Sequence, residues 1–398
     1  MFVFVLNCGS SSLKYQLLDM RNERRLAFGL VERIGMKDSV LTYEPATGGK
    51  VHEVADIPDH ELAIKQVLGK LIDSQVGVIK SLADIGAIGH RVVHGAEKFS
   101  GSVLINDAVL AALRENIPLA PLHNPANITG IEAMLSAMPG VANVGVFDTA
   151  FHATMPPESF LYAVPYAWYE QHHVRRYGFH GTSHRFVSER AAKILGIASD
   201  QFNCITCHMG NGSSFTAVRE GKSYDTSMGM TPLEGMVMGT RCGDIDAGIP
   251  SFLATNVNMS FADIDNALNK QSGLLGISGI SSDMRDVHGA AKEGHARARL
   301  AIDVLRHRAL KYIGAYAIEL GRVDAIIFTG GIGENDIDFR GSIVERLTVL
   351  GIRLDATANN VRGKEVLIST DDSPIKVMVV PTNEELVIAR DTREIVGS

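Results

Sequence analysis

One pattern occurs twice in the 398-residue chain and limits the folds that the chain can adopt. A short apolar run at 2–6 leads into a turn of Gly and Ser residues and then into a second apolar stretch at 13–18. The same order of strand, Gly/Ser turn and strand returns at 204–218, about 200 residues later. We therefore expect two β-hairpins, each opening one half of a duplicated molecule.

Other segments alternate between strand and helix patterns. Short apolar runs predict strands at 87–93, 144–148, 325–328 and 375–380. Helical spacing of apolar residues predicts helices at 61–72, 128–138, 290–320 and 384–390. The prolines between 155 and 165 interrupt regular structure and are the expected boundary between the halves. Strands that alternate with helices, together with hairpins, indicate an α/β fold.

Charge and composition exclude several classes of protein. The 38 basic and 45 acidic residues give a net charge of -7 and no basic run interrupts the mixture, so no nucleic-acid partner is expected. No apolar stretch approaches the roughly 20 residues that span a bilayer, and the N-terminus has no secretory pattern. Four cysteines are too few for a disulfide framework in a chain of this length. We expect a cytoplasmic protein with no membrane partner.

Turns of Gly and Ser follow three of the expected strands, at Gly9–Ser12, Gly210–Ser214 and Gly330–Gly333. Such turns expose backbone N–H groups without bulky side chains, which is what a phosphate chain requires of a protein. None of them has the spacing of a P-loop or of the Rossmann fingerprint. The pattern favours a nucleotide-binding protein outside both of those classes.

Charged residues next to these turns are the candidates for chemistry. Arg91, His180 and Arg241 lie among glycines and apolar residues, where they could be structural ion-pair partners or could bind a carboxylate and a phosphoryl group. Asp148 follows an apolar strand and Glu384 follows the last one. An acidic residue in such a place is either a catalytic or Mg²⁺-directed carboxylate or a helix N-cap, and the residues alone leave both interpretations open.

Two patterns resemble metal sites, but we do not expect either of them to bind a metal. Cys204-x-x-Cys207-His208 has no second cysteine pair elsewhere, so a structural zinc site is not predicted. His180 and His184 have helical metal-ligand spacing, but a glycine follows His180 and indicates that it begins in a turn. We expect a site histidine followed by a helix start.

Taken together, seven ordered motifs resemble those of the acetate kinase family. They are Asn7–Lys14, Gly89–Gly95, Phe147–His152, His180–His184, Met238–Arg241, Thr329–Asn335 and Pro381–Glu385. The resemblance runs from residue 6 to the last predicted helix. It implies the duplicated ribonuclease H-like α/β fold that acetate and sugar kinases share with heat-shock 70 proteins and actin, with a cleft between two domains. The domains expected are 1–150 with 383–398, and 151–382; a homodimer is also implied.

The resemblance implies ATP/ADP as co-substrate and Mg²⁺, with Mn²⁺ as an alternative. It assigns Asn7 and Glu384 to the metal and Lys14 to the ATP phosphates. The residues that it places around the nucleotide are Ser10, Ser12, Lys14, His208, Met209, Gly210, Asn211, Gly212, Asp283, Met284, Arg285, Gly331, Ile332, Gly333, Glu334 and Asn335.

The implied reaction is phosphoryl transfer from ATP to acetate, which gives acetyl phosphate. By resemblance Arg91 holds the acyl carboxylate, Asp148 is the acid/base residue, and His180 and Arg241 stabilise the transition state. The residues that the resemblance places around the acyl group are Arg91, Val93, Leu122, His123, Phe179 and Pro232. Because a carboxylate with a pKa of about 4.3 is already ionised at neutral pH, no general base is needed. We hypothesise that Asp148 instead orients hydrated Mg²⁺ and balances the arginines.

Two alternatives belong beside this interpretation. A propionate or butyrate kinase of the same family would share the motifs, but the branched Val93 crowds the pocket and favours acetate. An ATP-driven switch of the actin or heat-shock type would share the fold without small-molecule phosphorylation. Arg91 and Arg241 argue against a switch, because such a protein has little use for an arginine dedicated to a substrate carboxylate.

Overall fold

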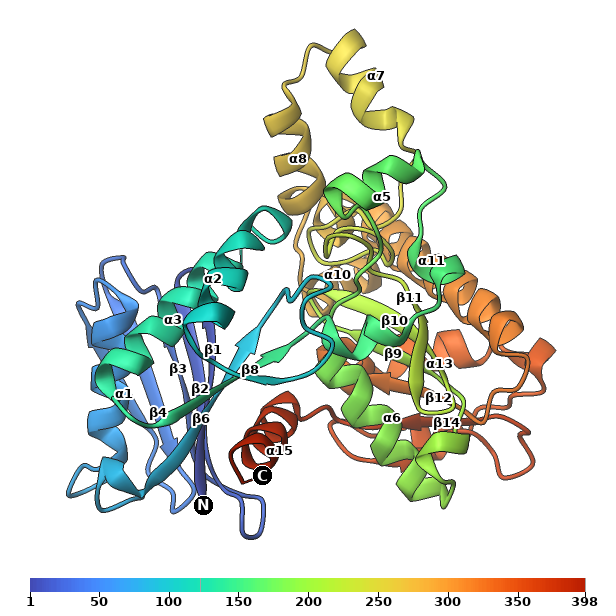
Figure 1. Cartoon of the computed structure of the whole chain (residues 1–398). Coiled ribbons are helices and arrows are strands. Elements are labelled where there is room, and N and C mark those ends of the chain that lie inside the picture. The colour runs from blue at the N-terminus through green and yellow to red at the C-terminus, as the bar shows by residue number, and fades with distance from the viewer. Residues whose placement is uncertain (122, 398) are drawn as a thin grey trace. The chain divides into compact units, whose positions relative to one another are not determined.

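The computed structural model describes residues 1–121 and 123–397, which form two compact units (Figure 1). Unit 1 comprises Met1–Phe151 and Asn383–Ser398, and unit 2 comprises His152–Thr382. Each unit contains one β-sheet with its own hydrophobic core.

The sheet of unit 1 has eight strands in the order β5-β4-β3-β2-β1-β6-β8-β7. The strands are β1 (Phe2–Gly9), β2 (Ser12–Asp19), β3 (Arg24–Glu32), β4 (Ser39–Pro45), β5 (Val51–Ala55), β6 (Ile85–Val92), β7 (Val103–Leu104) and β8 (Ala142–Phe147). β1 and β2 form the predicted hairpin, while β1, β6 and β8 run parallel to one another.

The sheet of unit 2 has six strands in the order β11-β10-β9-β12-β14-β13. The strands are β9 (Cys204–Met209), β10 (Ser213–Arg219), β11 (Lys222–Thr226), β12 (Ala325–Thr329), β13 (Val366–Leu367) and β14 (Lys376–Val379). The second predicted hairpin is confirmed as the antiparallel pair β9–β10, and β9, β12 and β14 are parallel.

The duplication that the hairpins indicate extends to the whole sheet. The order β3-β2-β1-β6-β8-β7 in unit 1 matches β11-β10-β9-β12-β14-β13 in unit 2, strand for strand. The directions agree as well: two antiparallel pairs, two parallel pairs and an antiparallel edge strand. Only β4 and β5 have no counterpart among the described strands of unit 2.

Helices cover both faces of the unit 1 sheet. They are α1 (His60–Leu71), α2 (Asp107–Glu115), α3 (Asn124–Ala137) and α15 (Glu384–Gly397). Because successive side chains of a strand point to opposite faces, Phe4 and Leu6 of β1 join a core under α1 and α3. Val3 and Val5 join a second core with Ile388 of α15. The last helix of the chain is therefore part of unit 1.

The longest helix of unit 2, α11, packs against α9, α10 and β10, whereas α7 and α8 project away from the sheet (Figure 1). The helices are α4 (Pro157–Phe160), α5 (Tyr166–His172), α6 (Gly181–Leu195), α7 (Gly248–Asn256), α8 (Phe261–Lys270), α9 (Gly273–Ser278), α10 (Met284–Lys292), α11 (Ala296–Leu320), α12 (Gly330–Asn335), α13 (Ile337–Val344) and α14 (Ala356–Asn359). α6 lies against β9 and β12. No helix in the described part of the chain is long and apolar enough to cross a membrane.

Several predicted boundaries are wrong. The single helix expected at 290–320 is two helices, because Gly294 has a φ of +93° and the His295 side chain accepts a hydrogen bond from Ala298 N and caps α11. The segment at 330–333 begins helix α12 rather than forming only a turn, and α15 continues to Gly397. β3, β4 and β5 were not anticipated.

Gly89 of β6 determines how closely α15 approaches the sheet. A Cβ at this position would lie 2.5 Å from Thr392 Oγ1 and 2.6 Å from Ile388 Cγ2, both on α15. We expect Gly89→Ala to displace α15 and to lower the free energy of unfolding by about 1–3 kcal/mol, measured as a lower urea midpoint.

Gly69→Ala on α1 is the matched control, since nothing lies within 4 Å of its Cβ position. It should leave stability unchanged or raise it by up to about 1 kcal/mol through higher helix propensity. Equal midpoints for both variants would contradict the close packing of α15.

Candidate active site

Three candidate residues of unit 1 lie where parallel strands end. Asn7 is near the end of β1, Arg91 is near the end of β6, and Asp148 directly follows β8. Because these strands run in the same direction, their carboxyl ends meet at one edge of the sheet, which is the usual place for a ligand site in such folds. Glu384, at the start of α15, completes the group.

Arg91 and Asp148 form a two-point ion pair. Arg91 Nε lies 2.9 Å from Asp148 Oδ1, and Arg91 Nη2 lies 2.6 Å from Asp148 Oδ2. The Asp148 side chain is only 2% exposed, whereas that of Arg91 is 21% exposed. The pair engages two of the five N–H donors of the guanidinium, so other donors remain for an anion. The ion-pair interpretation of Arg91 and the catalytic one are thus compatible.

The charges of this group influence one another. Burial disfavours the charged guanidinium, but the carboxylates of Asp148 and Glu384 outweigh it and hold the pKa of Arg91 above its usual range. Burial raises the pKa of the half-buried Glu384 to about 7; Arg91 and Lys14 oppose this rise, while Asp148 and Glu385 add to it. Unit 1 therefore holds crowded carboxylates that a further cation would stabilise.

A divalent ion fits these residues in chemistry. Carboxylate and amide oxygens, as in Glu384, Asp148 and Asn7, are the donors that Mg²⁺ prefers. Among the described residues, no cluster of three or more His, Cys, Asp or Glu side chains could hold a metal ion by itself. An ion here would take its remaining ligands from water and substrate phosphates, as Mg²⁺ commonly does.

The turn between β1 and β2 carries Ser10, Ser12 and Lys14, and it is anchored from α3 by a residue that the sequence analysis missed. Asn127 Nδ2 donates to the Cys8 carbonyl at 2.8 Å, and Asn127 Oδ1 accepts from Val93 N at 3.0 Å. One buried amide therefore links the end of β1 to the segment after β6. The signal was its place in the first turn of a helix with apolar neighbours.

In unit 2, His180 and Arg241 converge beside the β9–β10 turn. A methyl group at Gly212 would lie 3.4 Å from Arg241 Nη1 and 3.5 Å from His180 Nε2. Arg241 Nη1 donates to the Pro232 carbonyl at 3.2 Å, and burial lowers the pKa of Arg241. His180 has a φ of +56°, an unfavourable conformation for a side chain with a Cβ and one that often marks functional sites.

His208 extends this group. Its ring stacks on that of His180 with centroids 4.2 Å apart, and Ser183 Oγ lies 2.8 Å from His208 Nδ1. The predicted helix start after His180 is confirmed, because His180 is the N-cap of α6 and the helix begins at Gly181.

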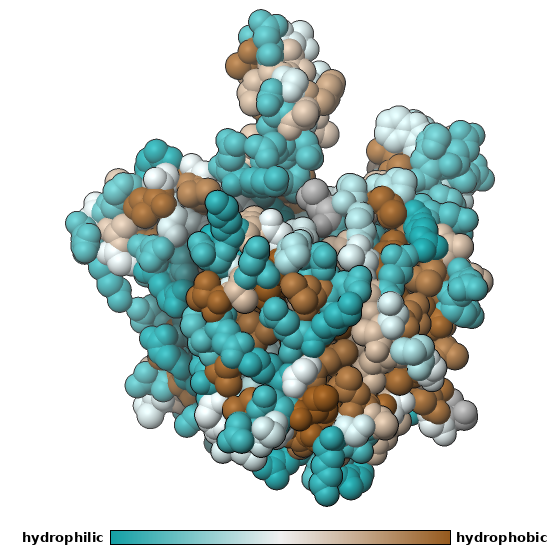
Figure 2. Space-filling model, turned by 90° about the vertical axis from the view of Figure 1, so that its left-hand side faces the viewer, coloured by the Kyte–Doolittle hydropathy of each residue, from teal (hydrophilic) through white to brown (hydrophobic). Residues whose placement is uncertain are grey.

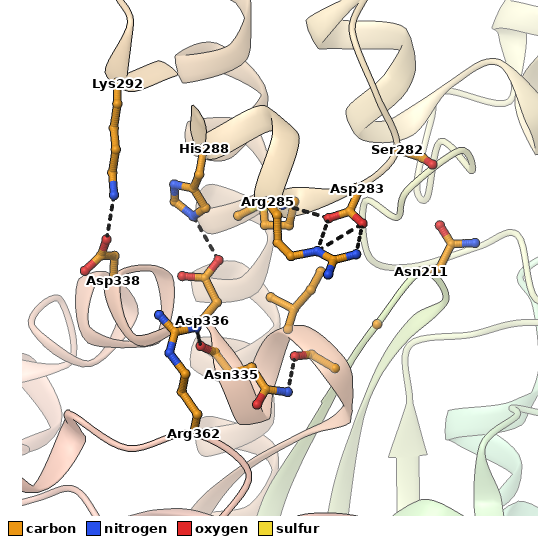
Figure 3. A pocket seen from close by; sticks show the side chains of 14 residues that line it. Asn211, Ser282, Asp283, Arg285, His288, Lys292, Asn335, Asp336, Asp338 and Arg362 are labelled. Carbon is orange, nitrogen blue, oxygen red and sulfur yellow. Dashed lines mark hydrogen bonds and ion pairs between the residues drawn. The ribbon is translucent and has the colours of Figure 1, made fainter. Parts of the chain in front are cut away.

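A cavity of about 820 Å³ lies next to these residues within unit 2 (Figure 3). Side chains of α10 face those of α12, α13 and the segment between them across this space. Asp283 accepts two-point hydrogen bonds from Arg285, which hold the pKa of Asp283 at about 2. The predicted nucleotide residues that line the cavity are Gly210, Asn211, Asp283, Met284, Arg285, Gly331, Ile332 and Asn335.

Other predicted nucleotide residues of unit 2 lie elsewhere. Met209 is buried in the hydrophobic core. Glu334 turns back on its own backbone, where Oε1 accepts from Gly330 N at 2.9 Å and from Thr382 N at 3.2 Å. The Gly333 carbonyl accepts from the buried Arg340 at 2.8 Å. These three residues shape the turn rather than line the cavity.

Part of the cavity lining was not predicted from the sequence. Ser282, His288, Lys292, Asp336, Asp338 and Arg362 also face the cavity. His288 Nε2 lies 2.8 Å from Asp336 Oδ2, so α10 is joined at the rim of the cavity to the residue that caps α13. The signal was the spacing of Met284, His288 and Lys292, which places all three on one face of a helix.

Some residues predicted for the acyl pocket belong to unit 1 and others to unit 2. Val93 is buried in unit 1, and His123 precedes α3 as its N-cap. Phe179 is buried in unit 2, and Pro232 is half-buried there. Leu122 lies outside the described residues.

The Arg91–Asp148 pair yields a double-mutant test. Arg91→Met and Asp148→Asn should each lower the free energy of unfolding by about 2–4 kcal/mol, because each leaves a buried charge without its partner. The double variant should lose clearly less than the sum of the two, as measured by urea unfolding. Additive losses would show that the two residues do not act as a pair.

Known proteins resemble this chain over its whole length. Residues 2–390 match the acetokinase family. The acetate kinase of Desulfitobacterium hafniense (strain Y51) is 55% identical over 396 residues, covering 100% of this chain and 99% of the relative. Crystal structures of Porphyromonas gingivalis acetate kinase and of a Francisella tularensis propionate kinase superimpose with TM-scores of 0.95 and 0.93, at 49% and 44% identity over 99% of both chains in each comparison. The chain therefore belongs to the acetokinase family.

Proposed function

We propose that this chain is an acetate kinase, which transfers the γ-phosphoryl group of ATP to acetate and forms acetyl phosphate and ADP reversibly. The observation that carries the proposal is the Arg91–Asp148 pair at the carboxyl edge of the unit 1 sheet. It presents an ordered guanidinium with unused N–H donors, which a small carboxylate substrate needs and an ATP-driven switch does not. Full-length relatives named acetate kinase support the same activity.

The proposed mechanism needs no general base. Acetate is ionised at neutral pH, so the barrier lies in bringing one anion to another. Arg91 binds and orients the carboxylate, while Arg241 and His180 donate hydrogen bonds to the phosphoryl oxygens in the transition state. Asp148 holds Arg91 in place and orients ligands of the metal. Glu384 and Asn7 would hold Mg²⁺, which would neutralise charge on the phosphates.

The cavity of unit 2 is the proposed site of the nucleoside. Its volume of about 820 Å³ lies within the range of small-molecule sites. Ile332 and Met284 provide apolar surface, and the Asp283–Arg285 pair provides an ordered polar rim. The turns at Gly210–Gly212 and Gly331–Gly333 expose N–H groups for the phosphates, with Lys14 of unit 1 as a further cation in the proposal.

The proposal extends to assembly and location. Helices α7 and α8, at the top of Figures 1 and 2, carry large exposed apolar side chains, among them Phe252 at 59% and Phe261 at 72% exposure. Apolar side chains gathered in this way support a self-associating surface, and we propose a homodimer. The four cysteines are free, which supports the cytoplasm as the compartment.

The acyl-chain preference tests the proposed substrate. Hydroxylamine trapping of the acyl phosphate should give the highest kcat/KM with acetate, because Val93 crowds the space for longer chains. Each added methylene should cost about 1–3 kcal/mol in kcat/KM, so propionate should still react. Equal or better efficiency with propionate would favour the propionate kinase alternative, and no acyl phosphate with any acid would overturn the activity.

Val93→Ala should narrow the difference between acetate and propionate in the same assay. Val3→Ala is the matched control, because Val3 is a buried valine near the start of β1, at the opposite end of that strand from Asn7. It should lower stability without changing the ratio of kcat/KM for acetate to kcat/KM for propionate.

The role of Asp148 can be separated from acid/base catalysis. Asp148→Asn should lose activity that a higher Mg²⁺ concentration partly restores, because the variant weakens the orientation of the ion rather than removing a base. The measurement is kcat at increasing Mg²⁺. Asp19→Asn, which disturbs another ion-paired carboxylate of unit 1, should show no such dependence. A loss indifferent to Mg²⁺ would reject the metal role.

A further inference from the structure

A buried chain of hydroxyl and imidazole groups leads from His180 into the sheet of unit 2. His180 Nδ1 lies 2.9 Å from Ser214 Oγ, and the same oxygen lies 2.7 Å from His184 Nε2. His184 Nδ1 lies 2.6 Å from Thr206 Oγ1. Ser214, His184 and Thr206 are fully buried, so the groups of the chain must satisfy one another.

The hydroxyl groups restrict where the protons can be. A hydroxyl carries one hydrogen, so Ser214 can donate to only one of its two imidazole neighbours and must accept from the other. The same holds for Thr206, whose Oγ1 lies 3.4 Å from the carbonyl of its cross-strand neighbour Thr216. A carbonyl can only accept, so in the arrangement that uses both contacts Thr206 donates to Thr216 and accepts from His184.

His184 passes the direction of hydrogen bonding on from Thr206 to Ser214. Burial first, and then the neighbouring His152 and His208, lower the pKa of His184 well below its usual value, so its ring is neutral. A neutral imidazole has one donor and one acceptor nitrogen. Since Nδ1 donates to Thr206, Nε2 accepts from Ser214. Ser214, having used its proton, accepts from His180 Nδ1.

We propose that Thr206, His184 and Ser214 are positioning residues that keep a proton on Nδ1 of His180. This inference rests on the proposed phosphoryl transfer for its catalytic meaning, but not for its geometry. With Nδ1 occupied, Nε2 of the neutral ring is an acceptor and would repel a phosphoryl oxygen. His180 donates from Nε2 only as an imidazolium, so it contributes a full positive charge beside Arg241 rather than a neutral hydrogen bond.

The surroundings of His180 agree with this role. Among the described residues of unit 2, the titratable and charged groups near His180 include His208, stacked on its ring, His184 beyond Ser214, and Arg241 across Gly212. The left-handed backbone of His180 aims Nδ1 at Ser214 and leaves Nε2 on the side of Gly212. His180 keeps its Nδ1 proton throughout, so the proposed role involves no proton transfer.

The first test measures tautomers directly. Nitrogen-15 NMR of the full-length protein with labelled histidine, assigned with His180→Asn and His184→Asn variants, should show both rings protonated on Nδ1 when they are neutral. A neutral ring that carries its proton on Nε2 instead of Nδ1, in either histidine, would overturn the proposal. The NMR measurement does not depend on turnover. It therefore tests the hydrogen-bonded chain of Thr206, His184 and Ser214 even if the protein proves not to phosphorylate acetate.

The second test breaks this hydrogen-bonded chain, the relay, at Thr206, which is the end away from His180. Thr206→Val has nearly the same shape but removes the acceptor of His184 Nδ1, and we expect kcat to fall about tenfold with unchanged KM for ATP and acetate. Its activity should also decline at a different pH from that of the wild type, since the proton on His180 is no longer fixed. Thr206→Ser, which keeps the hydroxyl, should recover most of kcat.

Thr226→Val is the matched control. Thr226 is a buried threonine on β11 that binds Thr216 Oγ1 at 2.8 Å and is not part of the relay. It should cost stability while kcat and the pH profile stay near those of the wild type. Equal effects of Thr206→Val and Thr226→Val would show that Thr206 is merely structural and would overturn the proposal.

Discussion

The candidate site residues of each unit depend on the parallel pairing of three strands. In unit 1 these are β1, β6 and β8, and in unit 2 they are β9, β12 and β14. Hydrogen bonding between parallel strands forces all three to end at the same edge, so residues far apart in the sequence come together there. In each sheet the first of the three strands also turns back at this edge as a hairpin, and its Gly/Ser turn adds backbone N–H groups to the site.

The two units balance charge in opposite ways. In unit 1, Arg91 is matched by Asp148 and Glu384, and the surplus of carboxylates favours a cation. In unit 2, Arg241 donates to a carbonyl oxygen and a thioether sulfur. In these two contacts its positive charge faces a dipole and not a carboxylate. Burial of a cation in that way is costly, and a bound phosphate would offset the cost. The units are therefore suited to a metal ion and to an anion, respectively.

Local sequence patterns predicted the elements that depend on local physics. Continuous apolar runs identified β1, β9 and β12, because strands buried on both faces need apolar side chains at every position. β3, β4 and β5 lie towards the edge of their sheet and mix polar with apolar residues, so their pattern was too weak to detect. The break between α10 and α11 went unnoticed because the apolar spacing continues across Gly294.

The sequence by itself determined the duplication, the two hairpins and the family, because these are properties of residue order and spacing. Only the tertiary structure decided that Arg91 is bound by Asp148, that Glu334 turns away from the cavity, and that His180 is connected through Ser214 to His184 and Thr206. Those contacts join segments 25 or more residues apart in most cases, and distances between such segments depend on how the whole sheet packs. No local pattern records which donor meets which acceptor once both are buried.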